Sequence, residues 1–224
     1  ASAHFSGGRR TALLALFSVG FIVATGSWIN AMISLQLCFV GVAISFLIGS
    51  AIGIWAAVNN RVSAAIAPVC DTLQTMPIFV FLIPAVMIVL VGEFTALIAI
   101  VIYAIVPSIR YAEHGIRKVP LEVIESARML GATPRQLLWQ VQIPVAAPEF
   151  ALGLNQTIMM ALAMVIVASL VGAQGLGSEV MIGLSRADTG RGLVAGLSVA
   201  LIAIVADRTL QSGSSKSKEA LGLR

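Results

Sequence analysis

Long stretches of this sequence contain no Asp, Glu, Lys or Arg, and they limit the possible folds more than any other feature. About 17 to 25 consecutive apolar residues, coiled as a helix, match the hydrocarbon thickness of a bilayer. Only 11% of the residues are charged, which excludes an ordinary water-soluble globule. We therefore predict an all-α integral membrane protein with about six transmembrane helices. The apolar runs are Leu13–Ile29, Met32–Val58, Thr72–Val91, Phe94–Ile109, Phe150–Val171 and Gly192–Ala206.

Two of these runs are less regular than the others. Gly192–Ala206 is short, and Thr72–Val91 contains Pro77 and Pro84, which kink or break a helix. Around the membrane domain, 11–209, we expect a cytoplasmic N-terminal segment, 1–10, and a disordered cytoplasmic tail, 210–224, because that tail is rich in Ser and Lys.

The positions of the basic residues predict the orientation of the chain. With a cytoplasmic N-terminus and six spans, only Arg186 and Arg191 of the 14 Lys and Arg residues fall on the outer side. Cytoplasmic loops carry an excess of Lys and Arg, so we expect both termini in the cytoplasm and no nucleic-acid partner. The residues on the inner side are Arg9, Arg10, Arg61, Arg110, Arg117, Lys118, Arg128, Arg135, Arg208, Lys216, Lys218 and Arg224.

One long cytoplasmic connection, about 110–149, contains signals for two short helices. Pro120 suits the first turn of a helix over Leu121–Leu130, and Gly131 suits its left-handed C-cap. The residues Thr133-Pro134-Arg135-Gln136 form a predicted capping box, which begins a second helix that should end near Pro144. We therefore expect a helical hairpin at the membrane face.

The hairpin has one apolar and one charged face, so it is a candidate docking surface. The pattern alone leaves an interfacial helix on lipid headgroups equally open. Glu125-Ser126-Ala127, then Gly131, then Val141-Gln142-Ile143-Pro144 resembles the EAA loop, Glu-Ala-Ala-x3-Gly-x9-Ile-x-Leu-Pro, of binding-protein-dependent ABC permeases. Ser126 replaces Ala, Val141 replaces Ile and Ile143 replaces Leu, but the spacing is intact.

Further blocks in the same order narrow the resemblance to the glycine betaine/proline permeases. They are Asp71–Pro77, Leu82–Met87, Gly131–Gln136, Gly153–Met159, Gly172–Gly177 and Asp207-Arg208. This resemblance implies a type I ABC importer permease in a bacterial inner membrane, with an imported solute such as glycine betaine, proline, choline, carnitine or trimethylamine N-oxide. It also implies three protein partners, namely an ATP-binding cassette ATPase dimer, a second permease copy and an extracytoplasmic solute-binding protein.

The resemblance also assigns the hairpin to coupling with the ATPase. The implied coupling residues are Glu122, Glu125, Ser126, Ala127, Arg128, Gly131, Ala132 and Pro144. The sequence has no GxxxxGK[ST] motif, so we expect this chain to be a non-enzymatic subunit that binds no cofactor, with ATP and Mg²⁺ on the partner ATPase. It has no HExxH, GxSxG or paired intramembrane carboxylates, which argues against an intramembrane enzyme. A permease for another small solute, or a stand-alone secondary transporter or channel, remains the alternative.

Polar residues within the apolar runs are candidates for the translocation path, because hydrocarbon disfavours them. These candidates are Asp71, Gln74, Thr75, Asn155, Gln156 and Thr157. Asp71 suits either a path for a cationic solute or a structural cap. Consecutive helical residues point about 100° apart, so Asn155, Gln156 and Thr157 cannot all face one pore, and we expect at least one to join helices.

Small residues repeat every four positions in the second run, at Gly41, Ser45, Gly49 and Gly53. This small-xxx-small ladder predicts close packing against another helix, which an importer built from two permease subunits needs. Gly172–Gly177 lacks the Lys-Ser/Thr ending of a phosphate-binding loop, so we predict a tight turn near an external gate. His4 and His114 have no second ligand in spacing and predict no metal site.

Overall fold

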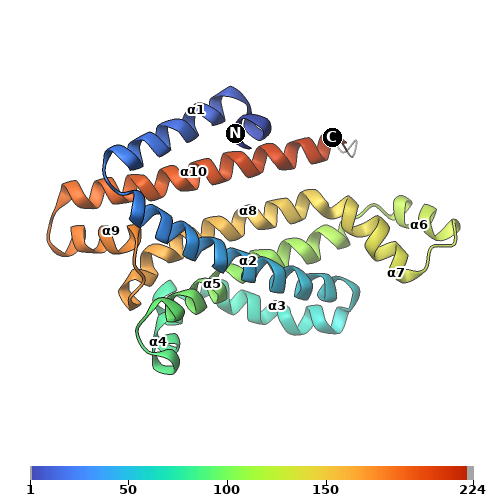
Figure 1. The fold of residues 1–224 in the computed structure, drawn as a ribbon. Helices are drawn as coiled ribbons and strands as arrows, with labels where there is room; N and C mark the ends of the chain where they lie inside the picture. Colours follow the sequence, from blue (N-terminus) through green and yellow to red (C-terminus); the bar gives the residue numbers. More distant parts are fainter. Residues whose placement is uncertain (1, 221–224) are drawn as a thin grey trace.

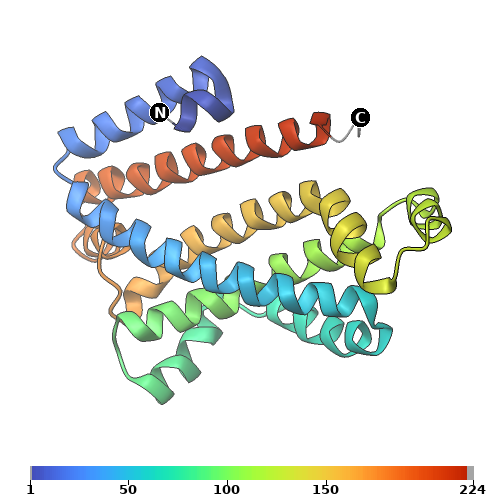
Figure 2. The ribbon, with the colours of Figure 1, turned by 45° about the vertical axis from the view of Figure 1, so that its right-hand side comes forward.

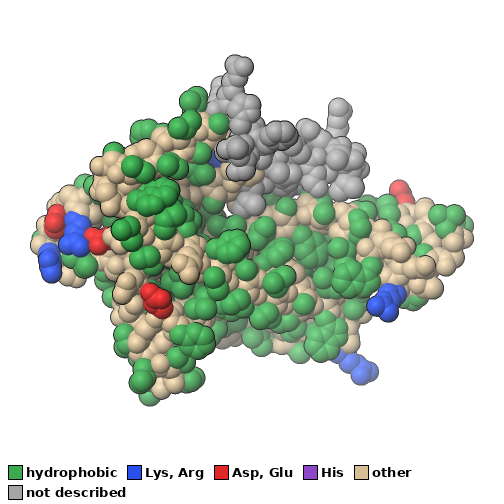
Figure 3. Space-filling view, viewed as in Figure 1, with side chains coloured by type: hydrophobic (Ala, Val, Ile, Leu, Met, Phe, Trp, Pro, Cys, Tyr) green, Lys and Arg blue, Asp and Glu red, His purple; other side chains and the backbone are tan. Residues whose placement is uncertain are grey.

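The computed structural model describes the backbone of residues 2–220 and the side chains of residues 11–80 and 82–209. Within this part every regular element is a helix. Four helical segments are long and apolar enough to cross a membrane: α2 (Trp28–Val58), α5 (Glu93–Arg117), the continuous segment Pro134–Val171, and Thr189–Thr209 of α10 (Thr189–Ala220). They run lengthwise through the bundle (Figures 1 and 2). Figure 3 shows apolar side chains along the bundle and charged ones toward its two ends.

The predicted span Thr72–Val91 is broken in the structure. Helix α3 (Asn60–Thr75) and helix α4 (Ile78–Val89) meet at an angle of 109°. The break falls at Met76 and Pro77, because a residue that precedes proline is pushed out of the helical region into extended backbone, and Met76 has ψ 136°. Pro84 lies inside α4. If the bent pair is one span, the described chain has up to five candidate spans by length and composition.

The first two runs also have different boundaries from those predicted. Helix α1 (Ser2–Ala24) ends before Ile29, and α2 begins at Trp28 rather than Met32. Gly26 makes the turn between them with φ +70°, a conformation that glycine adopts without strain. The apolar part of α1, Thr11–Ala24, is shorter than the four candidate spans.

Helix α5 continues to Arg117, well beyond the predicted end at Ile109. The connection to the next membrane helix is therefore shorter than the predicted 110–149. Helix α6 (Leu121–Met129) and the single turn α7 (Pro134–Gln136) lie within it. The backbone stays helical past Ile109 because the polar side chains that follow find hydrogen-bond partners on α2 and α3.

The predicted helix end near Pro144 is wrong. A π-helical turn, η1 (Leu137–Gln142), leads directly into α8 (Ile143–Ala168). The amide of Ile143 bonds to the carbonyl of Leu138, five residues back. A wider turn before Pro144 relieves the clash between the proline ring and the preceding turn, so the helix passes through.

The end of the bundle opposite α6 contains a turn and a short helix. After α8, the 3₁₀ turn η2 (Ser169–Val171) leads into Gly172 and Gly175, with φ +95° and +106°. Helix α9 (Leu176–Ser185), which the sequence did not predict, follows. The tight turn predicted at Gly172–Gly177 is present. At the other end of the chain, α10 is helical to Ala220, within the segment 210–224 that was expected to be a disordered tail. Residues 221–224 lie outside the described residues.

The small-residue ladder of α2 packs against α5 of the same chain. A Cβ atom at Gly41 would lie 2.6 Å from Cγ2 of Ile100, and one at Gly49 would lie 2.6 Å from Cβ of Ser108. Ser45 donates a hydrogen bond to the carbonyl of Val101 at 3.3 Å. The ladder therefore sets the distance between the two helices that form the centre of the bundle.

Acid should loosen the α9 end, where Arg191 and Asn30 both donate hydrogen bonds to Glu179. The bond from Arg191 holds the pKa of Glu179 below its ordinary value of 4.5. Because the pKa of Glu179 is lower in the folded state, its ionised carboxylate adds to the free energy of unfolding. This contribution is fully present above pH 4.5 and is lost as the pH falls through the lowered pKa. We expect the thermal midpoint of the wild type to fall over this range, and that of Glu179→Gln to start lower and fall less. Melting curves across pH test this.

Glu93→Gln is the control for that experiment, because Glu93 is an exposed acid at the same end that makes no ion pair within the described residues. Its midpoint should follow that of the wild type at every pH. If the midpoints of all three proteins fell in parallel with decreasing pH, Glu179 would not be the group that makes the α9 end sensitive to acid.

Candidate functional site

Helix α6 extends beyond the ends of α5 and α8 at one end of the bundle (Figures 1 and 2). None of its residues is buried. Met129 and Leu130 are each 90% exposed, and Val123 is also exposed. The apolar face predicted for this helix is therefore present but is not covered by the rest of the described chain.

A Schellman motif ends α6. The amide of Ala132 bonds to the carbonyl of Ala127 at 3.1 Å, and the amide of Gly131 bonds to the carbonyl of Arg128 at 2.9 Å. Gly131 has φ +82°, as its predicted role at the C-cap requires. The turn is closed by backbone hydrogen bonds, so α6 has a defined direction.

The predicted capping box is present on the other side of the turn. The Thr133 hydroxyl accepts a hydrogen bond from the amide of Gln136 at 3.3 Å, and the Gln136 side chain accepts one from the amide of Thr133 at 2.9 Å. Pro134 occupies the first turn of α7. The two caps together fix the angle between α6 and the helix that continues into the membrane segment.

The residues predicted for coupling lie on and beside this hairpin. Ser126 is exposed and its hydroxyl donates to the carbonyl of Glu122 at 2.7 Å. Ala127 and Ala132 are half-buried at the turn, and Pro144 is exposed in the first turn of α8. The charged side chains of this set are all exposed: Glu122, Glu125 and Arg128.

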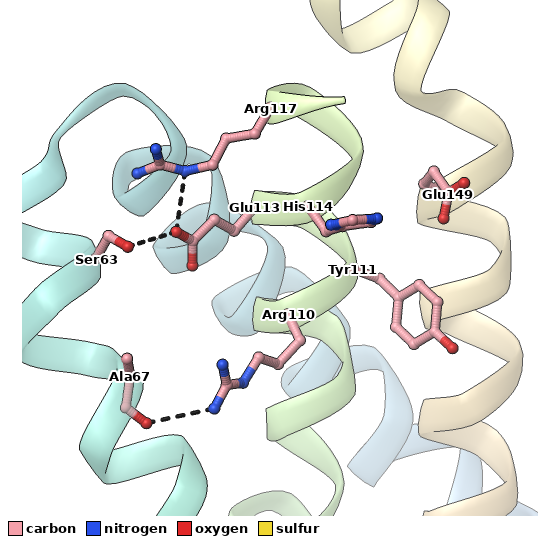
Figure 4. Close-up of a pocket in the computed structure, with 8 residues that line it drawn as sticks. All are labelled: Ser63, Ala67, Arg110, Tyr111, Glu113, His114, Arg117 and Glu149. Atoms are coloured by element: carbon pink, nitrogen blue, oxygen red, sulfur yellow. Dashed lines mark hydrogen bonds and ion pairs between the residues drawn. The ribbon is translucent and has the colours of Figure 1, made fainter. Parts of the chain in front are cut away.

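A cavity of about 550 Å³ lies between α3, α5 and α8, near the same end of the bundle. Figure 4 shows Arg110, Glu113 and Arg117 of α5 pointing toward α3, while His114 and Tyr111 lie on the side of α8. The cavity is thus bordered by opposite charges on one side and by rings on the other. Its lining residues are Ser63, Ala67, Arg110, Tyr111, Glu113, His114, Arg117 and Glu149.

One corner of this cavity is rigidly tied together. Arg117 donates to Glu113 at 3.1 Å, to the Asn60 side chain at 3.0 Å and to the carbonyl of Ala56 at 2.9 Å. Glu113 also accepts a hydrogen bond from the Ser63 hydroxyl at 2.6 Å. These contacts join α2, α3 and α5, so this corner holds the shape of the cavity.

The α3 candidates for the translocation path are exposed. Asp71 pairs with Arg110, and its side chain is 68% exposed. Gln74 and Thr75 are exposed on the same helix, where the Thr75 hydroxyl bonds to the carbonyl of Thr72 at 3.1 Å. Asp71 therefore faces an ion-pair partner across the gap between α3 and α5 rather than capping a helix end.

The α8 candidates face three different ways, as their spacing requires. The Asn155 amide donates to Asp207 of α10 at 2.8 Å, and Gln156 is exposed. Thr157 is fully buried and bonds to the Ser108 hydroxyl of α5 at 2.7 Å. In this structure the hydroxyl of Thr157 thus joins α8 to α5.

The sequence analysis missed the charged residues that line the cavity. Arg110, Glu113 and Arg117 are spaced three and four residues apart, which places them on one face of a helix. That signal was available, but the predicted helix end at Ile109 assigned these residues to a loop. Glu149 of α8 lies near them only because the two helices cross, which no local pattern indicates.

Comparison with known proteins agrees with this architecture. Residues 49–211 match the family described as the binding-protein-dependent transport system inner membrane component. Among solved structures, the chain is similar to the MetNI methionine ABC transporter in an inward-facing conformation, with a TM-score of 0.69. This likeness, at 23% identity, covers 84% of this chain and 93% of that one. It supports the fold of a type I ABC importer permease.

Sequence relatives extend the match over the whole chain. The trimethylamine N-oxide transport system permease protein TmoV of Ruegeria pomeroyi is 40% identical over 223 residues, which are 100% of this chain and 34% of the relative. The glycine betaine/carnitine transport permease protein GbuB of Listeria monocytogenes is 42% identical over 191 residues, 85% of this chain and 68% of the relative. The chain therefore spans only a third of the first relative's length. It belongs to the family of binding-protein-dependent transport system inner membrane components.

Proposed function

We propose that this chain is the permease subunit of an ATP-driven importer of small methylated amines, with both termini in the cytoplasm. The observation that carries the proposal is the α6 hairpin. It combines two fixed caps with apolar side chains that the described chain leaves uncovered. A rigid hairpin of this kind transmits a domain movement, whereas a flexible linker would absorb it.

The proposed partner at α6 is an ATPase dimer, which would bind the ATP and Mg²⁺. A second permease copy would complete the translocation pore, and an extracytoplasmic binding protein would deliver the solute. The basic residues support this orientation, because Arg128 and Arg135 lie at the α6 end together with Lys118. On the same grounds, Arg186 and Arg191 at the α9 end would face outward.

The solute class is inferred from what the relatives' names have in common. They name trimethylamine N-oxide, glycine betaine and carnitine. All three contain a fully substituted, methylated nitrogen that cannot donate a hydrogen bond. Such a group is recognised by aromatic faces and by carboxylates, so we expect the binding protein to supply an aromatic cage. Choline, which contains the same kind of nitrogen, is a further candidate solute. Proline, which the sequence resemblance also implies, is a candidate without that group.

Copurification tests the proposal directly. The tagged chain, expressed with its neighbouring ATPase and binding-protein subunits, should retain the ATPase and accumulate labelled glycine betaine or trimethylamine N-oxide only when ATP is hydrolysed. Uptake that persists with a hydrolysis-deficient ATPase would indicate a stand-alone transporter or channel instead.

Glu125→Ala should weaken ATPase retention or coupling without changing solute preference. Glu125 is exposed, and no hydrogen bond or ion pair of the described residues uses its carboxylate. Loss of one partner of a buried interfacial charge pair costs about 2–5 kcal/mol. The solute concentration for half-maximal uptake should stay nearly unchanged, because the hairpin lies outside the solute path. Uptake curves and ATPase retention on the purified complex measure both effects.

Two variants make this experiment specific. Glu125→Gln keeps the size of the side chain and should show the loss caused by the charge alone. Glu93→Ala removes an exposed acid at the opposite end of the bundle and should keep the ATPase bound. A shifted solute preference with full ATPase retention in Glu125→Ala would place this residue in the solute path and contradict the proposed orientation.

A further inference from the structure

We propose that the cavity between α3, α5 and α8 is a binding site for a zwitterionic methylated amine at the α6 end of the path. The methylated cationic group would contact Tyr111 and Glu149, and the anionic group would contact Arg110. This inference rests on the proposed function, since it names a place in this chain where the proposed solute binds.

The cationic half of the site is formed where α5 and α8 cross. A Cβ atom at Gly115 would lie 2.7 Å from Cβ of Glu149, and one at Gly153 would lie 2.7 Å from Cβ of Tyr111. These two glycines bring the helices together, so that the Tyr111 ring and the Glu149 carboxylate border the same side of the cavity (Figure 4). An aromatic ring beside a carboxylate suits a methylated ammonium, which has no N–H to donate.

The Glu149 carboxylate is available to such a cation. Its side chain is only 20% exposed, yet the ion pair that the structure gives it is long, 3.6 Å to Nζ of Lys118. The Lys118 side chain is itself 64% exposed. A mostly buried carboxylate with a distant, solvated partner is incompletely compensated, so a cation within the cavity would stabilise it.

The anionic half lies across the cavity, toward α3. Arg110 extends from α5 and donates to the carbonyl of Ala67 at 3.4 Å while it pairs with Asp71. Because Asp71 is largely exposed, this ion pair is weak and can be exchanged. A guanidinium group binds a carboxylate through two parallel hydrogen bonds, so a solute carboxylate can replace Asp71.

The other charges of the cavity are already engaged. Arg117 makes the contacts to α2 and α3 described above, and Glu113 accepts hydrogen bonds from both Arg117 and Ser63. These residues form a wall that is held in place by contacts within the chain. The groups left for a ligand are thus a guanidinium on one side and, on the other, a carboxylate with the rings of Tyr111 and His114.

Saturation-transfer NMR on the assembled transporter in lipid nanodiscs, with the binding protein left out, tests this site. The probes are glycine betaine, tetramethylammonium and glycerol, so that the cationic group is examined with and without an anionic group attached to it. We expect the N-methyl protons of glycine betaine to receive saturation, tetramethylammonium to receive less, and glycerol to receive none.

Variants should distinguish the cationic half of the site from the anionic half. Tyr111→Ala should weaken the binding of glycine betaine and tetramethylammonium by about threefold to tenfold, and Tyr111→Phe should retain it. Glu149→Gln should also weaken both probes, whereas Arg110→Gln should weaken glycine betaine but leave tetramethylammonium unchanged. A general loss of structure would weaken all probes equally. Phe94→Ala, which removes an aromatic side chain at the other end of α5, is the matched control and should bind like the wild type.

The outcomes separate this inference from the proposed function. If the transporter imports glycine betaine but its saturation signal is absent, or is unaffected by Tyr111→Ala and Arg110→Gln, the site is overturned and the function stands. If the signal is lost in Phe94→Ala instead, the solute binds at the opposite end and the site is likewise overturned. If the transporter takes up none of the methylated amines, the proposed solute class fails, and the site fails with it.

Discussion

Gly131→Val should abolish most of the coupling between ATP hydrolysis and uptake while the protein still inserts into the membrane. Gly131 has φ +82°, and a Cβ atom there would meet nothing within 4 Å, so the effect is purely one of backbone conformation. A β-branched residue in this region costs about 1–3 kcal/mol, which corresponds to a loss of about fivefold to 150-fold in the population of the native turn. The Schellman bonds to Ala127 and Arg128 would be lost, and α6 would no longer hold its direction. Uptake and ATPase rates of the reconstituted complex measure the loss.

Gly131→Asn is the matched control, because asparagine tolerates the left-handed conformation far better than valine does. It should retain most of the coupling although it adds a larger polar side chain. Equal losses in the two variants would mean that the added bulk, and not the backbone, disturbs the interface. Normal coupling in Gly131→Val would contradict the assignment of this hairpin.

The two caps of the hairpin could be predicted because their structure is decided by local chemistry. Gly131 requires no tertiary contact to adopt a positive φ, and Thr133 finds its partner three residues away. The apolar runs of α2 and α8 could also be predicted, because every helix that spans a bilayer needs about 20 predominantly apolar residues. Elements of this kind are specified by short segments of sequence.

The ends of the helices depended on contacts that no short segment reveals. Helix α5 continues to Arg117 because that side chain reaches Ala56 and Asn60 on other helices. The helix continues past Pro144 because a π-helical turn precedes it. The break between α3 and α4 falls at Pro77, but the sequence offered Pro84 as a second position for it. The cavity was missed for the same reason, since its two sides come from helices far apart in the sequence.

The small-residue ladder of α2 predicted a close contact with another helix, but it did not identify that helix. The spacing from Gly41 to Gly53 predicted close approach, and the structure supplies α5 of the same chain as the approaching helix. A small-residue stripe does not indicate whether its partner is in the same chain or in another. That ambiguity matters here, because α5 also carries the side chains that line the cavity.

Gly53→Ala should therefore destabilise the protein and disturb the cavity as well. A Cβ atom at Gly53 would overlap the carbonyl oxygen of Ile109 and lie 2.7 Å from Cβ of Ala112. The Ile109 oxygen belongs to the backbone of α5, and the Ala112 Cβ is bonded directly to that backbone. Neither atom can move aside alone, so α5 must shift as a whole. Overpacking of this kind costs about 1–3 kcal/mol. The thermal midpoint should fall, and the binding of glycine betaine should weaken with it.

Gly196→Ala provides the matched control for this last prediction, because a Cβ atom there meets nothing within 4 Å in another membrane helix, α10. Its midpoint should be unchanged or raised, since alanine favours a helix over glycine by about 1 kcal/mol. A second change, Ala112→Gly in the Gly53→Ala background, removes one of the two clashing atoms and should restore part of the midpoint. Equal midpoints for Gly53→Ala and Gly196→Ala would show that α2 and α5 are not held at this distance in the membrane, and the cavity that their contact positions would lose its structural basis.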